Sequence, residues 1–210
     1  MANQNGNMYG LTILSPIIDD PTIKISHDTA LRMYLQNMHR HELSPFAKVS
    51  GTHFCRLVVM DDVVYVGAPA CEEHLKSRYL VFETNFDGDL DTYLTRMANE
   101  TPEFVEEVWK HCVGYPGLSD VNAFVAYMKK CRIPTTFFFA DVNDRTVETT
   151  LKALQTQAAI EHFIQKHQGK DPAEIQREFG ALIHTLAHAP LPEAGGDESN
   201  RTPQEDRVHD

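Results

Sequence analysis

The sequence has little positive charge. Its 19 Lys and Arg residues stand against 30 Asp and Glu residues, which gives a formal net charge of −11. An acidic chain repels the phosphates of nucleic acids and the anionic surfaces of membranes, so neither is expected as a partner. No apolar run approaches the roughly 18 residues of a membrane-spanning helix, and the start, MANQNGNMYG, does not resemble a signal peptide. A cytoplasmic location is therefore the expectation.

The common signatures of metal, nucleotide and serine chemistry are also missing. The four cysteines, Cys55, Cys71, Cys112 and Cys131, form no C-x-x-C pair that would indicate a zinc site or a redox dithiol. We interpret them as reduced thiols. The sequence has no Walker loop, no G-x-G-x-x-G and no G-x-S-x-G motif. Nucleotide binding and serine hydrolysis have no motif support, and no metal site is predicted.

The length and composition indicate one substantial globular unit. A chain of 210 residues, 42 % of them hydrophobic, can bury a core without disulfides. We assign residues 1–188 to a single α+β domain. Residues 189–210 combine Pro, Gly and charged residues with almost no large apolar side chains, so they cannot offset the entropy of ordering. They are expected to form a disordered acidic tail.

Four segments have the composition of β-strands: residues 9–17, 52–60, 79–86 and 135–142. The last contains three consecutive phenylalanines, which predicts a central strand or one covered on both faces. Helical periodicity separates the strands, and two extra C-terminal helices are predicted over residues 147–167 and 172–188. This order predicts a ferredoxin-like antiparallel four-stranded sheet with helices on one face. The other face must then be buried by something else.

The strand predicted over residues 79–86 contains polar side chains. Glu83 and Asn85 share one face of it, and that face is too polar for a core packed by helices. Arg56, on the neighbouring strand, can form a cross-strand pair with Glu83. The pair can be a structural ion pair. Alternatively, Arg56, Glu83 and Asn85 can be the polar anchors that hold a cofactor or another small molecule in an apolar cavity.

Two titratable residues stand at strand ends. His53 begins a buried strand, where a neutral imidazole can act as a base or can hydrogen-bond the neighbouring backbone. Asp87 precedes Gly88 in a turn pair, where its carboxylate can serve a site or cap the helix that starts at Leu90. Both are candidate catalytic residues.

The element order and the GTHF and NFDG strand ends resemble the dimeric α+β-barrel superfamily, whose members bury the free sheet face against a second sheet. Within it, TNFDGD (residues 84–89) is similar to the G-x-x-D-G stretch of dye-decolourising peroxidases, with threonine in place of the first glycine. The resemblance implies a homo-oligomer with haem in an enclosed apolar cavity. It also implies that Asp87 and Arg56 handle peroxide on one side of the porphyrin, with a helical histidine, His162 or His184, as axial ligand.

The leading hypothesis is therefore a haem-dependent, peroxidase-like oxidoreductase. Two alternatives from other classes stay open. One is a non-enzymatic protein, either a small-molecule binder or an oligomeric scaffold, in which the same polar residues fix a partner or stabilise a sheet interface. The other is a cofactor-independent monooxygenase that uses His53 and Asn85 on a small aromatic substrate.

Overall fold

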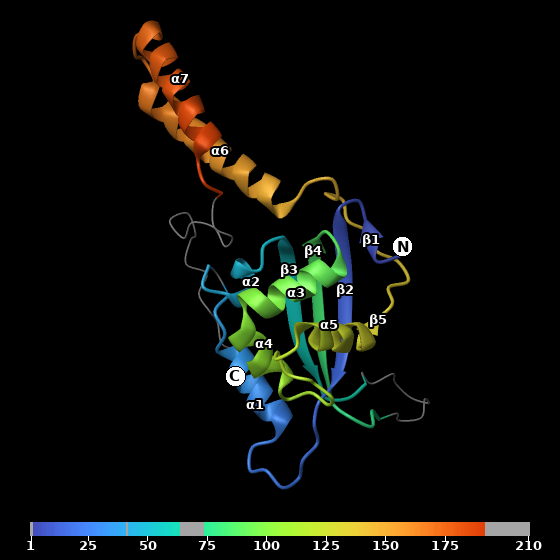
Figure 1. Ribbon diagram of the computed structural model, residues 1–210. Helices are drawn as coiled ribbons and strands as arrows, with labels where there is room; N and C mark the ends of the chain where they lie inside the picture. Colours follow the sequence, from blue (N-terminus) through green and yellow to red (C-terminus); the bar gives the residue numbers. More distant parts are fainter. Residues whose placement is uncertain (1, 41, 64–73, 192–210) are drawn as a thin grey trace, which may run out of the picture.

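A computed structural model describes residues 2–40, 42–63 and 74–191 of the chain. Within them the chain has an α+β fold that combines an open antiparallel sheet of five strands with seven helices (Figure 1). The strands are β1 (Gln4–Asn5), β2 (Met8–Pro16), β3 (Thr52–Met60), β4 (Tyr79–Asp87) and β5 (Arg132–Ile133). The helices are α1 (His27–Gln36), α2 (Pro45–Lys48), α3 (Leu90–Glu100), α4 (Pro102–Trp109), α5 (Val121–Lys130), α6 (Val147–His167) and α7 (Pro172–His188). None of these described helices is both long and apolar enough to cross a membrane.

The sheet is built around β2 and β4, which pair antiparallel along their full lengths. Strand β3 pairs with the other side of β4, while β1 and β5 each pair with the free side of β2. The strands predicted over residues 9–17, 52–60 and 79–86 are confirmed to within one residue. In β4 buried and partly exposed residues alternate, and this period of two places one set of side chains on each face of the sheet.

Helices α1, α3, α4 and α5 lie over one face of the sheet (Figure 1). The core between the two layers is rich in aromatic rings. Trp109 is fully buried, and its ring centroid lies 5.5 Å from that of Phe82, 6.0 Å from that of Phe104 and 6.2 Å from that of Phe124. All three contacts have edge-to-face geometry, which stabilises a pair of rings by about 0.5–1.5 kcal/mol beyond the burial of their area.

The fourth strand predicted over residues 135–142 is wrong. The chain forms only the two-residue strand β5 just before it, at the edge of the sheet, and residues 135–142 have no strand pairing. Phe137 and Phe139 are 81 % and 66 % exposed. The ring of Phe138 instead lies over Gly10 of β2, where a Cβ atom would come within 2.8 Å of it. A glycine that leaves room for a ring has therefore overridden the strand propensity of the phenylalanines.

Helices α6 and α7 form an antiparallel hairpin that projects from the rest of the molecule (Figure 1). We call residues 147–188 the arm. The two predicted helices are confirmed, and their bounds are Val147–His167 and Pro172–His188. Thr146 and Asp171 begin them, because each side chain accepts hydrogen bonds from backbone N–H groups of the first turn. Most of the predicted tail, residues 192–210, lies outside the described residues, and the tail's disorder and the single domain over residues 1–188 stay predictions.

Candidate functional site

The sheet face opposite the helices carries the candidate residues. Glu83, Asn85 and Asp87 of β4 point to this face, because their neighbours Phe82, Thr84 and Phe86 are fully buried under the helices. In the single chain the β3 part of this face is open to solvent, where Phe54 is 57 % exposed, whereas the ring of Phe138 covers its β2 part at Gly10, the partner of Asn85. We call this sheet face the open face.

A β-bulge in β3 brings His53 to the open face. Thr52 pairs with Phe86, and Phe54 pairs with the next residue, Asn85, so that two residues of β3 advance against one of β4. His53 is the extra residue. Simple alternation places His53 and Phe54 on opposite faces, and a bulge re-aims a side chain in this way.

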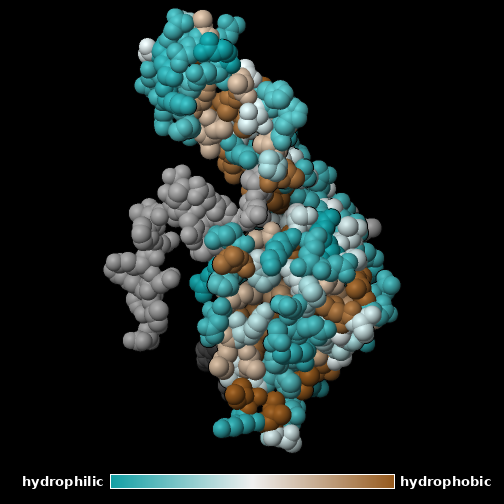
Figure 2. Space-filling model, turned by 60° about the vertical axis from the view of Figure 1, so that its left-hand side comes forward, coloured by the Kyte–Doolittle hydropathy of each residue, from teal (hydrophilic) through white to brown (hydrophobic). Residues whose placement is uncertain are grey.

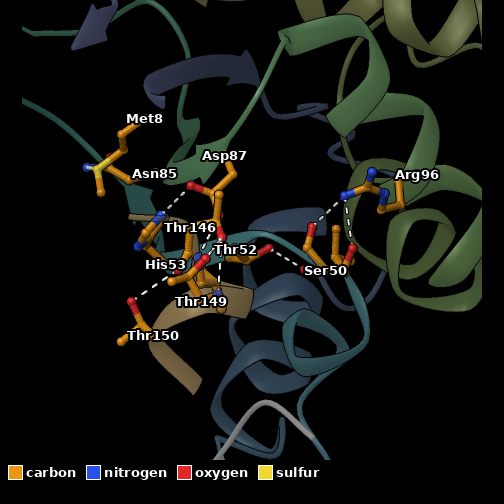
Figure 3. A network of polar contacts seen from close by, with 12 residues as sticks. Met8, Ser50, Thr52, His53, Asn85, Asp87, Arg96, Thr146, Thr149 and Thr150 are labelled. Carbon is orange, nitrogen blue, oxygen red and sulfur yellow. Dashed lines mark hydrogen bonds and ion pairs between the residues drawn. The ribbon is translucent and has the colours of Figure 1, made fainter. Parts of the chain in front are cut away.

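His53 forms a hydrogen-bonded pair with Asp87 (Figure 3). The Nε2 atom of His53 lies 2.9 Å from Oδ1 of Asp87, and the second carboxylate oxygen accepts the backbone N–H of Val147 at 2.8 Å. The side chains of His53 and Asp87 are 20 % and 15 % exposed, so the pair is partly buried but accessible. Because an ionised carboxylate only accepts hydrogen bonds, the Nε2 atom of His53 carries the proton, and the Nδ1 atom of a neutral ring is left as a base.

The position of Asp87 is set by the backbone around it. Its N–H donates to the carbonyl oxygen of Gly51 at 2.9 Å, and Gly51 has a positive φ of 85° at the turn into β3. The carboxylate lies at the N-terminus of α6, where the helix dipole favours negative charge. The alternative role of Asp87 as the cap of α3 is wrong, because Asp89 accepts the N–H of Thr92 at 3.0 Å instead.

The predicted cross-strand pair is present on the same face. The Nε atom of Arg56 donates to Glu83 at 3.0 Å, but the Arg56 side chain is 67 % exposed, so the pair contributes little to stability in the single chain. Asn85 lies between this pair and His53, next to Met8 of β2, with its Nδ2 atom 3.8 Å from the sulfur. A thioether is a weak acceptor, which leaves most of the hydrogen-bonding capacity of the Asn85 amide for a ligand.

The two histidines predicted as axial ligands do not join this cluster. His162 is exposed on α6, about 22 Å along the helix axis from its first residue, Val147. His184 is exposed on α7, beside His188, with ring centroids 4.5 Å apart. Among the described residues, no group of three or more His, Cys, Asp or Glu side chains could hold a metal ion.

The cysteines of the described chain do not supply a nucleophile at this site. Cys55, Cys112 and Cys131 are free thiols, in agreement with the prediction, and Cys71 lies outside the described residues. Burial raises the pKa of Cys55 and that of Cys112 to about 12. Both thiols are therefore protonated and unreactive at neutral pH.

Replacing Asp87 by alanine is expected to loosen the start of the arm. The substitution removes the acceptor for the Val147 N–H and for His53, and hydrogen bonds to a charged group stabilise a fold by about 1–3 kcal/mol. Amide hydrogen exchange in the first turn of α6 should accelerate by roughly 5- to 100-fold. Asp89→Ala is the matched control, because it should accelerate exchange only in the first turn of α3. Unchanged exchange in α6 would show that Asp87 does not anchor the arm.

Three parts of the site were missed from the sequence: the backbone N–H of Val147, the sulfur of Met8 and the turn at Gly51. Met8 is next to Asn85 only because β2 and β4 are paired, and Val147 is 60 residues from Asp87 in the chain. Only the Thr146 N-cap signal before α6 could have suggested an anion site. In comparisons with known proteins, the chain matches no family model, no curated protein and no solved structure.

Proposed function

We propose that this chain is a cofactor-independent oxygenase in which His53 acts as the general base on a small aromatic substrate bound at the open face. The observation that carries the proposal is the 2.9 Å hydrogen bond between His53 and Asp87. A carboxylate that fixes the tautomer of a partly exposed imidazole is a common arrangement for proton abstraction.

The proposal includes a ferredoxin-like fold of the dimeric α+β-barrel type. Its support is the strand order β5, β2, β4, β3 with every pair antiparallel, and the four helices α1, α3, α4 and α5 on one face. The exposed Phe54 and the 42 % exposed Val58 add support, because a solvated apolar sheet face is unfavourable. In the proposed homodimer, the sheet of a second copy covers the open face and encloses the substrate cavity.

Each polar residue has a role in the proposed reaction. Nδ1 of His53 takes the proton of a phenolic hydroxyl, and the negative charge of Asp87 stabilises the imidazolium that forms. The Asn85 amide donates to the phenolate oxygen. The phenolate then reacts with molecular oxygen: one oxygen atom enters the ring, which becomes a quinone, and the other leaves as water. The pair of Arg56 and Glu83 borders the substrate and orients it.

Haem-dependent chemistry has weaker support from the residues. A haem held between Asp87 and Arg56 on one side and an axial histidine on the other requires these groups to face one another. His162 and His184 lie on the arm, and within one chain they do not face the other two. The residues of a single chain thus do not fit the haem site that the resemblance implies, and we derive no step through haem.

Oxygen consumption tests the proposal directly. The purified protein is incubated in air with a panel of small mono- and polycyclic phenols, and oxygen uptake and quinone absorbance are recorded. The proposal expects uptake of one O2 per quinone formed, without added metal or cofactor. In parallel, a mass spectrum of the molecules that copurify with the native protein should reveal an aromatic ligand.

Two other outcomes would replace the proposal. A strong Soret band between about 400 and 420 nm after addition of haemin, with peroxide-dependent turnover, would establish the haem enzyme instead. A protein that neither binds a phenol nor haem and consumes no oxygen would be the non-enzymatic scaffold, with the open face serving only as an interface.

A further inference from the structure

The arm has almost no core of its own. No residue of α7 is buried, and in α6 only His167, a polar residue, is buried. The two helices meet chiefly near their connection, where His167 pairs with Glu178 and the ring of Phe163 lies 5.5 Å from that of Phe179. Two helices packed only on each other cannot remove their apolar surface from water, and stable folds add a further layer.

The apolar stripe of α7 is wider than the part of it that α6 covers. The stripe has helical spacing and consists of Ile175, Phe179, Leu182, Ile183 and Leu186. Within it, Phe179 is 41 % exposed and Ile183 is 44 % exposed. On α6, Leu154 and Ile164 are 56 % and 55 % exposed. In Figure 2, brown hydrophobic surface is visible along the arm toward its junction with the sheet domain.

A shallow hollow also follows the first half of α6. Its volume is about 620 Å³, and its lining includes Ala153, Thr156 and Ile160. The rest of the lining is polar or charged and includes Glu148, Lys152 and Glu161, so a helix in this groove would contact a mixed surface. The hollow is a place where a helix from outside the described chain can pack.

We propose that the arm is a dimerisation element that pairs with the arm of a second copy to form an antiparallel four-helix bundle. The dimensions fit this partner. Helix α6 has 21 residues and is about 32 Å long, and two adjacent helices are about 20 Å wide, so each arm offers a face of about 600 Å² in projection. Stable interfaces bury roughly 800 Å² of accessible surface per partner, so a bundle of this kind must use the full face of the arm.

Charge favours a second copy as the occupant. The whole chain has 30 acidic and 19 basic side chains, whereas the arm has five acidic and four basic ones. The excess negative charge therefore lies almost entirely outside residues 147–188, and the arms can approach without strong repulsion. The same patch on both copies gives a closed two-fold interface and not an open chain of molecules.

The experiment measures the molar mass of the full chain by sedimentation over a range of concentrations. The wild-type protein is expected at twice its chain mass of 23.8 kDa, or at a higher even multiple. In the Val58→Asp background, which removes the proposed sheet interface, the double variant Leu154→Asp/Ile183→Asp places charges on the exposed apolar positions and should halve the mass. The control Ala181→Asp/Thr185→Asp adds the same charge to the opposite, exposed side of α7 and should leave the mass unchanged.

Hydrogen exchange provides a second measurement that needs no variant. Amides of α7 should exchange more slowly at high than at low concentration of the wild-type protein, because dimerisation buries the stripe. Three results would overturn the inference: a wild-type monomer at every concentration, an unchanged mass in Leu154→Asp/Ile183→Asp in the Val58→Asp background, or α7 exchange that is independent of concentration. Val58→Asp on the open face distinguishes the two proposed interfaces. It should disrupt the sheet interface, while the amides of α7 should stay protected from hydrogen exchange by the arm interface.

Discussion

Replacing Trp109 by alanine should lower the free energy of unfolding by about 3–5 kcal/mol, the largest loss of stability expected from a single substitution here. Trp109 is fully buried and its ring contacts those of Phe82, Phe104 and Phe124, so its removal leaves a cavity where α4, α5 and β4 meet. The indole Nε1 atom has no hydrogen-bond partner within the described residues. The loss should therefore come from packing alone.

Urea unfolding followed by circular dichroism measures this effect. Domains of this size are stable by roughly 5–15 kcal/mol, so the variant should unfold at a much lower urea concentration. Phe137→Ala is the matched control, because Phe137 is 81 % exposed and its truncation should change stability by less than about 0.5 kcal/mol. If Trp109→Ala and Phe137→Ala lowered the free energy of unfolding equally, the core would not lie where the rings of Phe82 and Trp109 meet.

Replacing His53 by alanine should reduce oxygen-dependent turnover by about 10²- to 10⁴-fold, the usual loss when a general base is removed. The phenol found to support oxygen uptake serves as substrate. The Michaelis constant should change little, because His53 acts mainly in the transition state. The turnover rate of Asp87→Asn should lie between those of the wild type and His53→Ala. The substitution keeps the shape of the side chain but removes the charge that stabilises the imidazolium.

The matched control for His53→Ala is His39→Ala, which removes an exposed histidine away from the sheet face. Its turnover should equal that of the wild type. A wild-type rate in His53→Ala, with the protein folded by circular dichroism, would remove His53 from the reaction. Asn85→Ala should instead raise the Michaelis constant and lower the rate together, because the Asn85 amide is proposed to bind both the phenol and the phenolate.

The strands were predictable where local composition and tertiary packing agree. The apolar run of β3 and the alternation of β4 each have one interpretation, and both match the structure closely. The cross-strand pair of Arg56 and Glu83 followed from this alternation, because neighbouring strands bring same-face residues together. Helical periodicity predicted the two long C-terminal helices for the same reason.

The remaining features depend on contacts between distant residues. The phenylalanines at 137–139 have strand propensity, but only the ring of Phe138 packs, on a glycine about 130 positions earlier. The meeting of Asp87 with Val147 depends on where α6 starts relative to the sheet. The bulge at His53 is one additional residue in a ladder, and no composition rule marks such an insertion.

The bulge at His53 has a second consequence, for solubility. Among the residues that the structure describes, β3 is the last strand on its side of the sheet, so its outer backbone groups could recruit a strand from another molecule. The insertion near one end of β3 breaks the regular spacing of those groups. Near the other end, the guanidinium of Arg32 donates a hydrogen bond to the carbonyl oxygen of Val59 at 3.1 Å. A variant that straightened β3 by deleting one residue would lose the histidine from its place and, at the same time, present an uninterrupted template for aggregation.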